Sequence, residues 1–204
     1  GKNAEVQLTF ETCGGFSNQL LSVAFVLTYA IVREVDVLVS PSMSMNGRQI
    51  SGIDQFPENR KDDGFGQVFD WSTAYTFLQR SRILLVSPEE WTSHTGNSVI
   101  ICKSDETLDK CTQKVKRCKQ KAVTNCHVHI ECPFIHTIWS VTFLKQHKEL
   151  FEEAVNSLIP SNAVKRMASL AIDKIHRMGP ANCSTFVHLR VEMDWREHCK
   201  NWLP

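Results

Sequence analysis

Apolar and polar residues alternate close to the start of the chain, and this alternation predicts a β-strand over Val6–Phe10. A tight turn with two glycines, Thr12–Ser17, follows this strand. The next stretch, Asn18–Arg33, is rich in Leu, Val and Ala and predicts a buried helix, and Asp36–Ser40 predicts a second strand. A strand, a turn, a helix and a strand in this order form a βαβ unit, which implies a parallel sheet with a right-handed crossover.

The later pattern continues to alternate strands with helices. Further strands are expected over Ile83–Ser87, Val99–Cys102 and Thr185–Glu192. Apolar residues at helical spacing predict helices over Phe143–Leu158 and Ala163–Met178, and another helix is expected to begin at Asp194. A polar surface loop is expected over Pro41–Gly66, before helical or mixed structure over Phe65–Gln79. We therefore expect an α/β fold with a Rossmann-like parallel sheet.

The composition of the chain narrows the function classes. Its 204 residues include 23 Lys and Arg against 22 Asp and Glu, a balance that argues against nucleic acid as the main partner. The longest apolar run, Leu20–Val32, is shorter than the ~18 residues of a membrane helix, so membrane contact would need a segment outside this chain. Eight cysteines without a CxxC pair favour disulfides in an oxidising compartment over zinc. Asn182 begins an N-glycosylation sequon.

Two polar clusters have alternative interpretations. Six basic residues between Lys110 and Lys121 indicate a solvated helix face or a loop pinned by cysteines, in preference to a patch for an acidic ligand. A second cluster contains the residue types that bind zinc, but its spacing matches no common zinc finger or ribbon. Disulfide cysteines and surface histidines are therefore the preferred interpretation of its members, which are Cys126, His127, His129, Cys132 and His136.

The first candidate for chemistry is the turn Gly14–Gln19 between the first strand and the helix. Ligands of parallel α/β sheets bind beyond the carboxyl ends of the strands, and a helix N-terminus offers free N–H donors to anions. Two glycines allow the backbone to approach a sugar or phosphate, and Asn18 and Gln19 add amide groups. The alternative is a simple tight turn with a helix cap, because two glycines fall short of the dinucleotide-binding fingerprint.

The second candidate is the segment His188–Trp195. In a strand, His188, Arg190 and Glu192 share one face. Three ionisable side chains are costly to bury, so this face is expected at a strand end that borders a cleft. There the planar fork of Arg190 suits a phosphate and Glu192 would orient it. The alternative is a structural Arg–Glu pair on an exposed edge strand.

Together these two segments resemble the GDP-fucose protein O-fucosyltransferase superfamily. The HLRxxxDWxxxC arrangement from His188 to Cys199 is similar to that of the animal enzymes that fucosylate epidermal-growth-factor-like repeats. The GGxxxQ turn and the HLRxExD form are similar to the plant and algal branch, as are Phe65–Asp70 and Leu84–Pro88. The resemblance extends thinly from about Val6 to Cys199, and its specificity depends on the two end motifs together.

This resemblance implies a metal-independent, inverting glycosyltransferase of the GT-B type, whose two Rossmann-like domains face each other across a nucleotide-sugar. Arg190 would contact the β-phosphate of GDP-fucose, His188 would lie beside the nucleotide, and Asn18 would position donor and acceptor. The backbone contacts of the turn with the donor would come from Gly15, Phe16 and Ser17. Glu192, a third catalytic candidate beside Arg190 and Asn18, matches only the plant-like branch. Some relatives carry a glutamate in the turn as general base where this chain has glycine, and the nearest acid, Glu11, is on the strand side, so the base is unassigned. The mechanism of the animal enzymes, in which Asn and Arg position the substrates and the departing phosphate takes the proton, fits this chain better.

The resemblance also implies an organisation and a location. Residues 1–180 would form the N-terminal domain and residues 181–204 the start of a truncated C-terminal nucleotide-sugar domain, so the chain is expected to be part of a longer enzyme and inactive by itself. No cofactor is implied beyond the donor GDP-fucose, and the acceptor would be a Ser or Thr hydroxyl of a protein in the endoplasmic reticulum or Golgi lumen. Two alternatives stay open: a related fucosyltransferase that acts on a glycan or polysaccharide, and a non-catalytic carbohydrate- or protein-binding module with the same fold.

Overall fold

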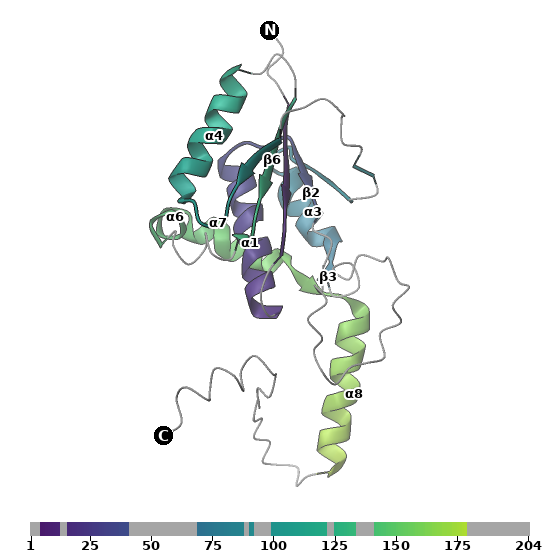
Figure 1. Cartoon of the computed structure of the whole chain (residues 1–204). Coiled ribbons are helices and arrows are strands. Elements are labelled where there is room, and N and C mark those ends of the chain that lie inside the picture. Colours follow the sequence, from purple (N-terminus) through teal and green to yellow (C-terminus); the bar gives the residue numbers. More distant parts are fainter. Residues whose placement is uncertain are drawn as a thin grey trace, which may run out of the picture. The chain divides into compact units, whose positions relative to one another are not determined.

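A computed structural model describes residues 5–12, 16–40, 69–87, 90–91, 99–121, 125–133 and 141–178 (Figure 1). The chain divides into two compact units, and the first contains every described helix and strand except α8 (Asn162–Met178). Several predictions concern residues outside the described ranges: the loop Pro41–Gly66, the strand Thr185–Glu192, the helix from Asp194 and the domain boundary at residue 180.

The first unit is built on a five-stranded parallel sheet in the order β4-β2-β1-β6-β5. Its strands are β1 (Val6–Phe10), β2 (Val37–Val39), β4 (Leu84–Val86), β5 (Val99–Cys102) and β6 (Cys126–Ile130). β1 pairs with β6 along its whole length and with β2 on its other side. The strands β3 (Phe69–Asp70) and β7 (Ile159–Pro160) form a separate, two-stranded antiparallel sheet. The predicted α/β class with a parallel sheet is confirmed, and the sheet is compatible with a Rossmann-like fold.

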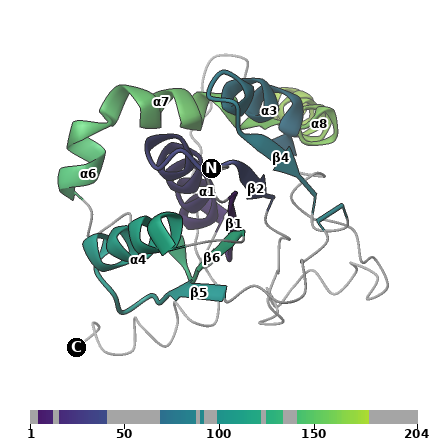
Figure 2. The ribbon, with the colours of Figure 1, turned by 90° about the horizontal axis from the view of Figure 1, so that it is seen from above.

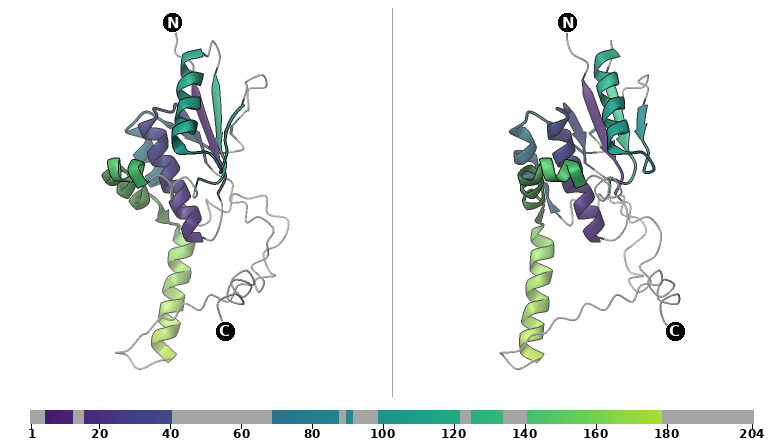
Figure 3. Two further views of the ribbon diagram at one scale, coloured as in Figure 1. Left: turned by 60° about the vertical axis from the view of Figure 1, so that its left-hand side comes forward. Right: turned by 90° about the vertical axis from the view of Figure 1, so that its left-hand side faces the viewer.

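The described helices of this unit cover one face of the sheet. The helices α1 (Phe16–Val32), α3 (Trp71–Gln79) and α4 (Leu108–Lys121) each lie between a strand and its spatial neighbour, and all three connections step the same way across the sheet. Because such crossovers are right-handed, these helices lie on the same face, as Figures 2 and 3 show. Outside them, α7 (Lys148–Ser157) packs on α1 and α3, and α6 (Val141–Gln146) precedes α7.

The core lies between this face and α1. Every residue of α1 from Ser22 to Ala30 is buried. The hydroxyls of Ser22 and Thr28 donate hydrogen bonds of 2.8 Å to the carbonyls four residues earlier, so these two buried polar groups have partners. The strands contribute alternate side chains, because neighbouring residues point to opposite faces. The buried strand residues on the helix side are Val6, Leu8, Phe10, Leu38, Cys102, Cys126, Val128 and Ile130.

The predicted helix Phe143–Leu158 is wrong as a single helix. The backbone of His147 is not helical (φ −120°, ψ 31°), and the segment divides into α6 and α7. The division accompanies a specific packing: the ring centroid of Phe143 lies 5.5 Å from that of Phe25 and 6.1 Å from that of Tyr29, both in α1. The break thus coincides with aromatic contacts between α6 and α1, and the spacing of apolar residues within one segment does not show such contacts between distant segments.

Two disulfides fix α4 to the sheet. Cys102 at the end of β5 is bonded to Cys111, and Cys118 is bonded to Cys126 at the start of β6. The basic run Lys110–Lys121 is therefore a helix that cysteines pin at two points. Cys132 is disulfide-bonded as well, whereas Cys13, Cys183 and Cys199 lie outside the described residues. Such bonds are typical of a protein that folds in an oxidising environment.

The described helices include none with the length and apolarity needed to cross a bilayer. The second unit is represented by α8 (Asn162–Met178), which agrees with the predicted helix Ala163–Met178 to within one residue. Met167 and Leu170 are exposed on it.

The disulfide between α4 and β6 predicts a measurable loss of stability. It closes a loop with a sequence separation of 8 residues, and the chain entropy of so short a loop corresponds to roughly 2–3 kcal/mol. Replacing both Cys118 and Cys126 with Ala should lower the free energy of unfolding in urea by about that amount. Non-reducing peptide mapping of the unaltered protein is the control. Free thiols at these two positions would contradict the pairing.

Candidate functional site

The five parallel strands end at one edge of the sheet, and a polar residue follows each strand there. These residues are Glu11 after β1, Ser40 after β2, Ser87 after β4, Lys103 after β5 and Glu131 after β6. Ligands of open α/β sheets bind outside the carboxyl ends of the strands. The carboxyl edge, and above all its centre around β1 and β6, is therefore the candidate site.

The predicted turn leads from β1 into α1 at this edge. The helix begins at Phe16, so Phe16, Ser17 and Asn18 form its first turn, which contains no acidic side chain. The first N–H groups of a helix have no partner within it, and they favour an anion. Asn18 is half-buried, and its carbonyl accepts a hydrogen bond from the Ser22 hydroxyl. α1 therefore starts close to the predicted position, and Phe16 and Ser17, expected in the turn before it, form part of its first turn.

The other predicted site residues are not described. Gly15 lies outside the described ranges, and so do His188, Arg190 and Glu192. The structure thus brings Phe16, Ser17 and Asn18 to the carboxyl edge, and the approach of Arg190 to Asn18 stays a prediction.

Thr12 lies between β1 and the turn and adds an unpaired polar group. The residue is 5% exposed, and its Oγ1 is buried with no hydrogen-bond partner among the described residues. A buried hydroxyl without a partner destabilises the fold by about 1–3 kcal/mol. A hydroxyl that can donate and accept is thus available close to the start of α1.

A row of hydrogen-bonded side chains lies on the face of the sheet opposite α1. The Oγ1 of Thr9 lies 2.8 Å from Nε2 of His127 and 2.9 Å from Nδ1 of His129. The Nε2 of His129 lies 3.5 Å from Oε1 of Glu11. Strand register places Thr9 beside His129 and Gln7 beside His127. Alternate residues of the two central strands therefore build one polar row, which ends in Glu11 at the carboxyl edge.

This row is buried at one end and open at the other. His127 is 8% exposed, and the ring of Trp91 packs edge-on against it with centroids 4.9 Å apart. The indole N–H of Trp91 also donates to Oε1 of Gln7 at 3.3 Å. The side chain of His129 is 26% exposed and that of Glu11 is 62% exposed. The row thus connects a buried imidazole with a carboxylate that a ligand can reach.

Burial also sets the charge of the inner histidine. It lowers the pKa of His127, and repulsion by the charge that His129 can carry lowers that pKa further. His127 therefore favours its neutral form, with one nitrogen that donates and one that accepts.

Two of the five residues that suggested a zinc site between Cys126 and His136 cannot act as zinc ligands. Cys126 and Cys132 are both disulfide-bonded and offer no thiolate to a metal ion. The preferred disulfide interpretation is confirmed for these two cysteines. The expectation of surface histidines is wrong for His127, because the sheet and Trp91 cover it. Within the described ranges no three His, Cys, Asp or Glu side chains are grouped so that they could hold a metal ion.

The strand β6 and the polar row on it were not predicted from the sequence. The signal was present, since residues 126–130 alternate Cys, Val and Ile with two histidines. Alternation with period two is typical of a half-buried strand, but the histidines suggested metal chemistry instead. Thr9 and His127 are 118 residues apart in the sequence, so no local pattern connects them.

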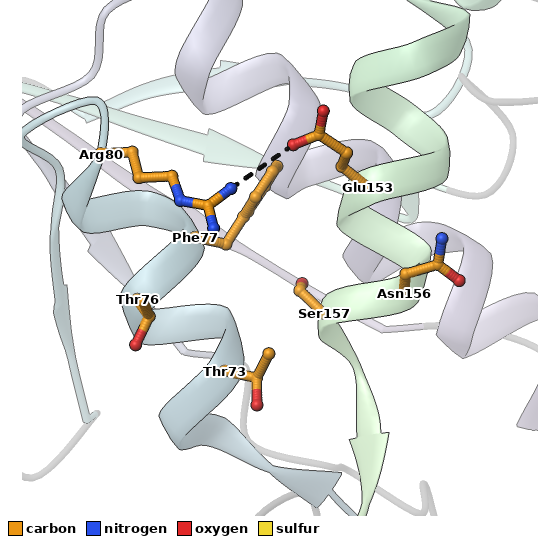
Figure 4. Close-up of a pocket in the computed structure, with 7 residues that line it drawn as sticks. All are labelled: Thr73, Thr76, Phe77, Arg80, Glu153, Asn156 and Ser157. Atoms are coloured by element: carbon orange, nitrogen blue, oxygen red, sulfur yellow. Dashed lines mark ion pairs between the residues drawn. The ribbon is translucent and has the colours of Figure 1, made fainter.

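A cavity of about 220 Å³ lies elsewhere, between α3 and α7. Figure 4 shows Thr73, Thr76 and Phe77 from α3, with Arg80 directly after it, on one side and residues of α7 on the other. The ion pair between Arg80 and Glu153 in its lining spans 3.7 Å, and both side chains are largely exposed. The cavity is smaller than the ~300 Å³ at which most ligand sites begin. It is therefore a weaker candidate than the carboxyl edge.

No protein-family model and no curated protein matches the chain. A function therefore has to be inferred from the motifs of the sequence and from the groups at the carboxyl edge. The edge offers two sets of groups: the start of α1 with Thr12 and Asn18, and the row that ends in Glu11.

The pKa shift of His127 predicts a pH-dependent stability. Its pKa is lowered on folding from the ordinary value of 6.5, so the native state binds this proton more weakly than the unfolded state. The contribution of His127 is complete above pH 6.5 and is lost as the pH falls below it. The free energy of unfolding should therefore decrease with acidification, and His127→Gln should remove part of that decrease. Urea titrations at several pH values measure it, with His176→Gln on α8 as the control. An unchanged pH dependence in His127→Gln would contradict the argument.

Proposed function

We propose that the chain is part of an inverting glycosyltransferase of the GT-B type that transfers fucose from GDP-fucose to a Ser or Thr hydroxyl of a protein. One observation supports it most strongly. β1, which lies between β2 and β6, connects to α1 at the carboxyl edge of a parallel sheet, where nucleotide ligands bind in such folds, and the connecting sequence contains Gly14 and Gly15. The same chain carries the His188-Leu189-Arg190 motif that accompanies this turn in the fucosyltransferase superfamily.

The charges of the reaction give each candidate residue a role. Transfer builds positive charge on the sugar and negative charge on the departing diphosphate. Arg190 would supply the cation for that diphosphate, because the planar fork of arginine binds two oxygens at once. Asn18 would position the donor and the acceptor, and the backbone of Gly15, Phe16 and Ser17 would contact the donor. His188 would lie beside the nucleotide.

Further support comes from the disulfides and from the remaining acidic candidate. The bonds Cys102–Cys111 and Cys118–Cys126 agree with the lumen of the endoplasmic reticulum or Golgi, where protein fucosylation would take place. Glu192 shares a strand face with Arg190 in the predicted strand and would orient its guanidinium group. Donor binding alone cannot choose between a protein and a glycan acceptor, so an acceptor screen would follow it.

Calorimetry of GDP-fucose binding to the full-length native protein tests this proposal. Arg190→Ala should weaken binding by roughly 1.5–3 kcal/mol, the range for a lost hydrogen bond to a charged group. Arg117→Ala makes the same chemical change at an exposed position of α4, beside the Cys118 that is bonded to the start of β6 and so at the edge of the sheet opposite the carboxyl ends, and should leave binding unchanged. A folded full-length protein that does not bind GDP-fucose would contradict the transferase and favour a non-catalytic binding module.

A further inference from the structure

We propose that Glu11 is the general base of the transfer and that His129 positions its carboxylate. This inference rests on the proposed function, and it assigns the proton to a protein side chain in place of the departing phosphate. It starts from the polar row on the face opposite α1, where Thr9 lies between the two imidazoles and His129 lies between Thr9 and Glu11.

One arrangement of the hydrogen bonds in the row turns a proton of His129 towards Glu11. The hydroxyl of Thr9 has one proton and three neighbours that can accept it: Nε2 of His127, Nδ1 of His129 and, at 3.5 Å, the carbonyl of Val128. When Thr9 donates to Nδ1 of His129, the proton of that neutral imidazole is on Nε2, which faces Glu11. This is the arrangement in which His129 positions the carboxylate.

The backbone holds Glu11 in place as well. Its N–H donates to the carbonyl of Ile130 at 3.1 Å, which extends the pairing of β1 with β6 by one residue. Glu11 therefore has a hydrogen-bonded main chain, a carboxylate oxygen 3.5 Å from Nε2 of His129, and a side chain that reaches solvent. These are the properties of a positioned general base.

The other described carboxylates near the central strands are directed elsewhere. Glu131 accepts a hydrogen bond from the Ser104 N–H at 3.4 Å, on the side of β5. Asp36 accepts from the Val6 N–H at 2.7 Å, and Glu5 accepts from Gln7, both at the opposite edge of the sheet. Glu11 is the acid that directly precedes the turn leading to Asn18. The base and the donor-positioning amide would thus lie on one connection.

The chemical step balances with these groups alone. The hydroxyl oxygen of the acceptor forms a bond to C1 of fucose, and the bond from C1 to the phosphate oxygen breaks. The departing GDP takes the electron pair of that bond, and the hydroxyl proton moves to the Glu11 carboxylate. Glu11 then releases the proton to solvent, which its exposure allows.

Hydrolysis of GDP-fucose by the full-length protein tests this role, because water then replaces the unidentified acceptor and loses its proton to the same base. Glu11→Gln should lower kcat for GDP release by about 10²–10⁴-fold, the usual contribution of general base catalysis, and should leave the calorimetric affinity for GDP-fucose unchanged. Glu5→Gln makes the same change at the opposite end of β1 and should keep the wild-type kcat.

Two substitutions of His129 separate positioning from packing. Gln places an amide N–H near the position of the imidazole Nε2, whereas Asn places one near that of Nδ1. His129→Gln should therefore keep most of the kcat, and His129→Asn should lose it, with the affinity for GDP-fucose unchanged in both. Equal losses in the two variants would overturn the positioning role.

The outcomes distinguish this inference from the function on which it rests. A wild type that does not bind GDP-fucose overturns the proposed function. A wild type that binds the donor but does not hydrolyse it, a Glu11→Gln variant with wild-type kcat, or an equal loss in Glu131→Gln overturns the assignment of Glu11 alone.

Discussion

The shared direction of the crossovers determines where the functional groups of this protein lie. In the strand order β4-β2-β1-β6-β5, the connections from β1 to β2, from β2 to β4 and from β5 to β6 all step the same way. Right-handedness then places α1, α3 and α4 on one face of the sheet. Polar side chains are tolerated on the opposite face of β1 and β6, because no described helix packs there. A helix on that face would require apolar residues where Thr9 and His129 stand.

The register of β6 beside β1 is the second constraint. Thr9 lies directly beside His129, and a slip of one residue would turn both histidines towards α1 and its apolar core. The disulfide Cys118–Cys126 attaches the start of β6 to α4, and Cys102–Cys111 does the same for the end of β5. The bond Cys118–Cys126 thus ties the strand that supplies His127 and His129 to α4, and Cys102–Cys111 ties the neighbouring strand to the same helix. The polar row therefore depends on the register of β6 beside β1, and β6 is attached at its start to α4.

The sequence predicted those elements whose signal is local. β1 and β5 have the expected bounds, because the alternation of apolar and polar residues reflects burial within a few residues. α1 was predicted from its apolar run and begins two residues before its expected start. Phe16 and Ser17, predicted as part of the turn, belong to α1. The break at His147 could not, since it accompanies the packing of Phe143 on α1. The polar row could not be predicted either, because it requires the pairing of two strands that are far apart in the sequence.

Hydrogen–deuterium exchange with GDP-fucose tests most directly whether the carboxyl edge around β1 and β6 is the site. On addition of the donor to the full-length protein, the account predicts slower exchange in peptides that cover residues 11–20 and 129–133. Peptides that cover residues 73–80 and 153–157, which line the cavity between α3 and α7, should be unchanged. Protection confined to these cavity peptides would contradict the account.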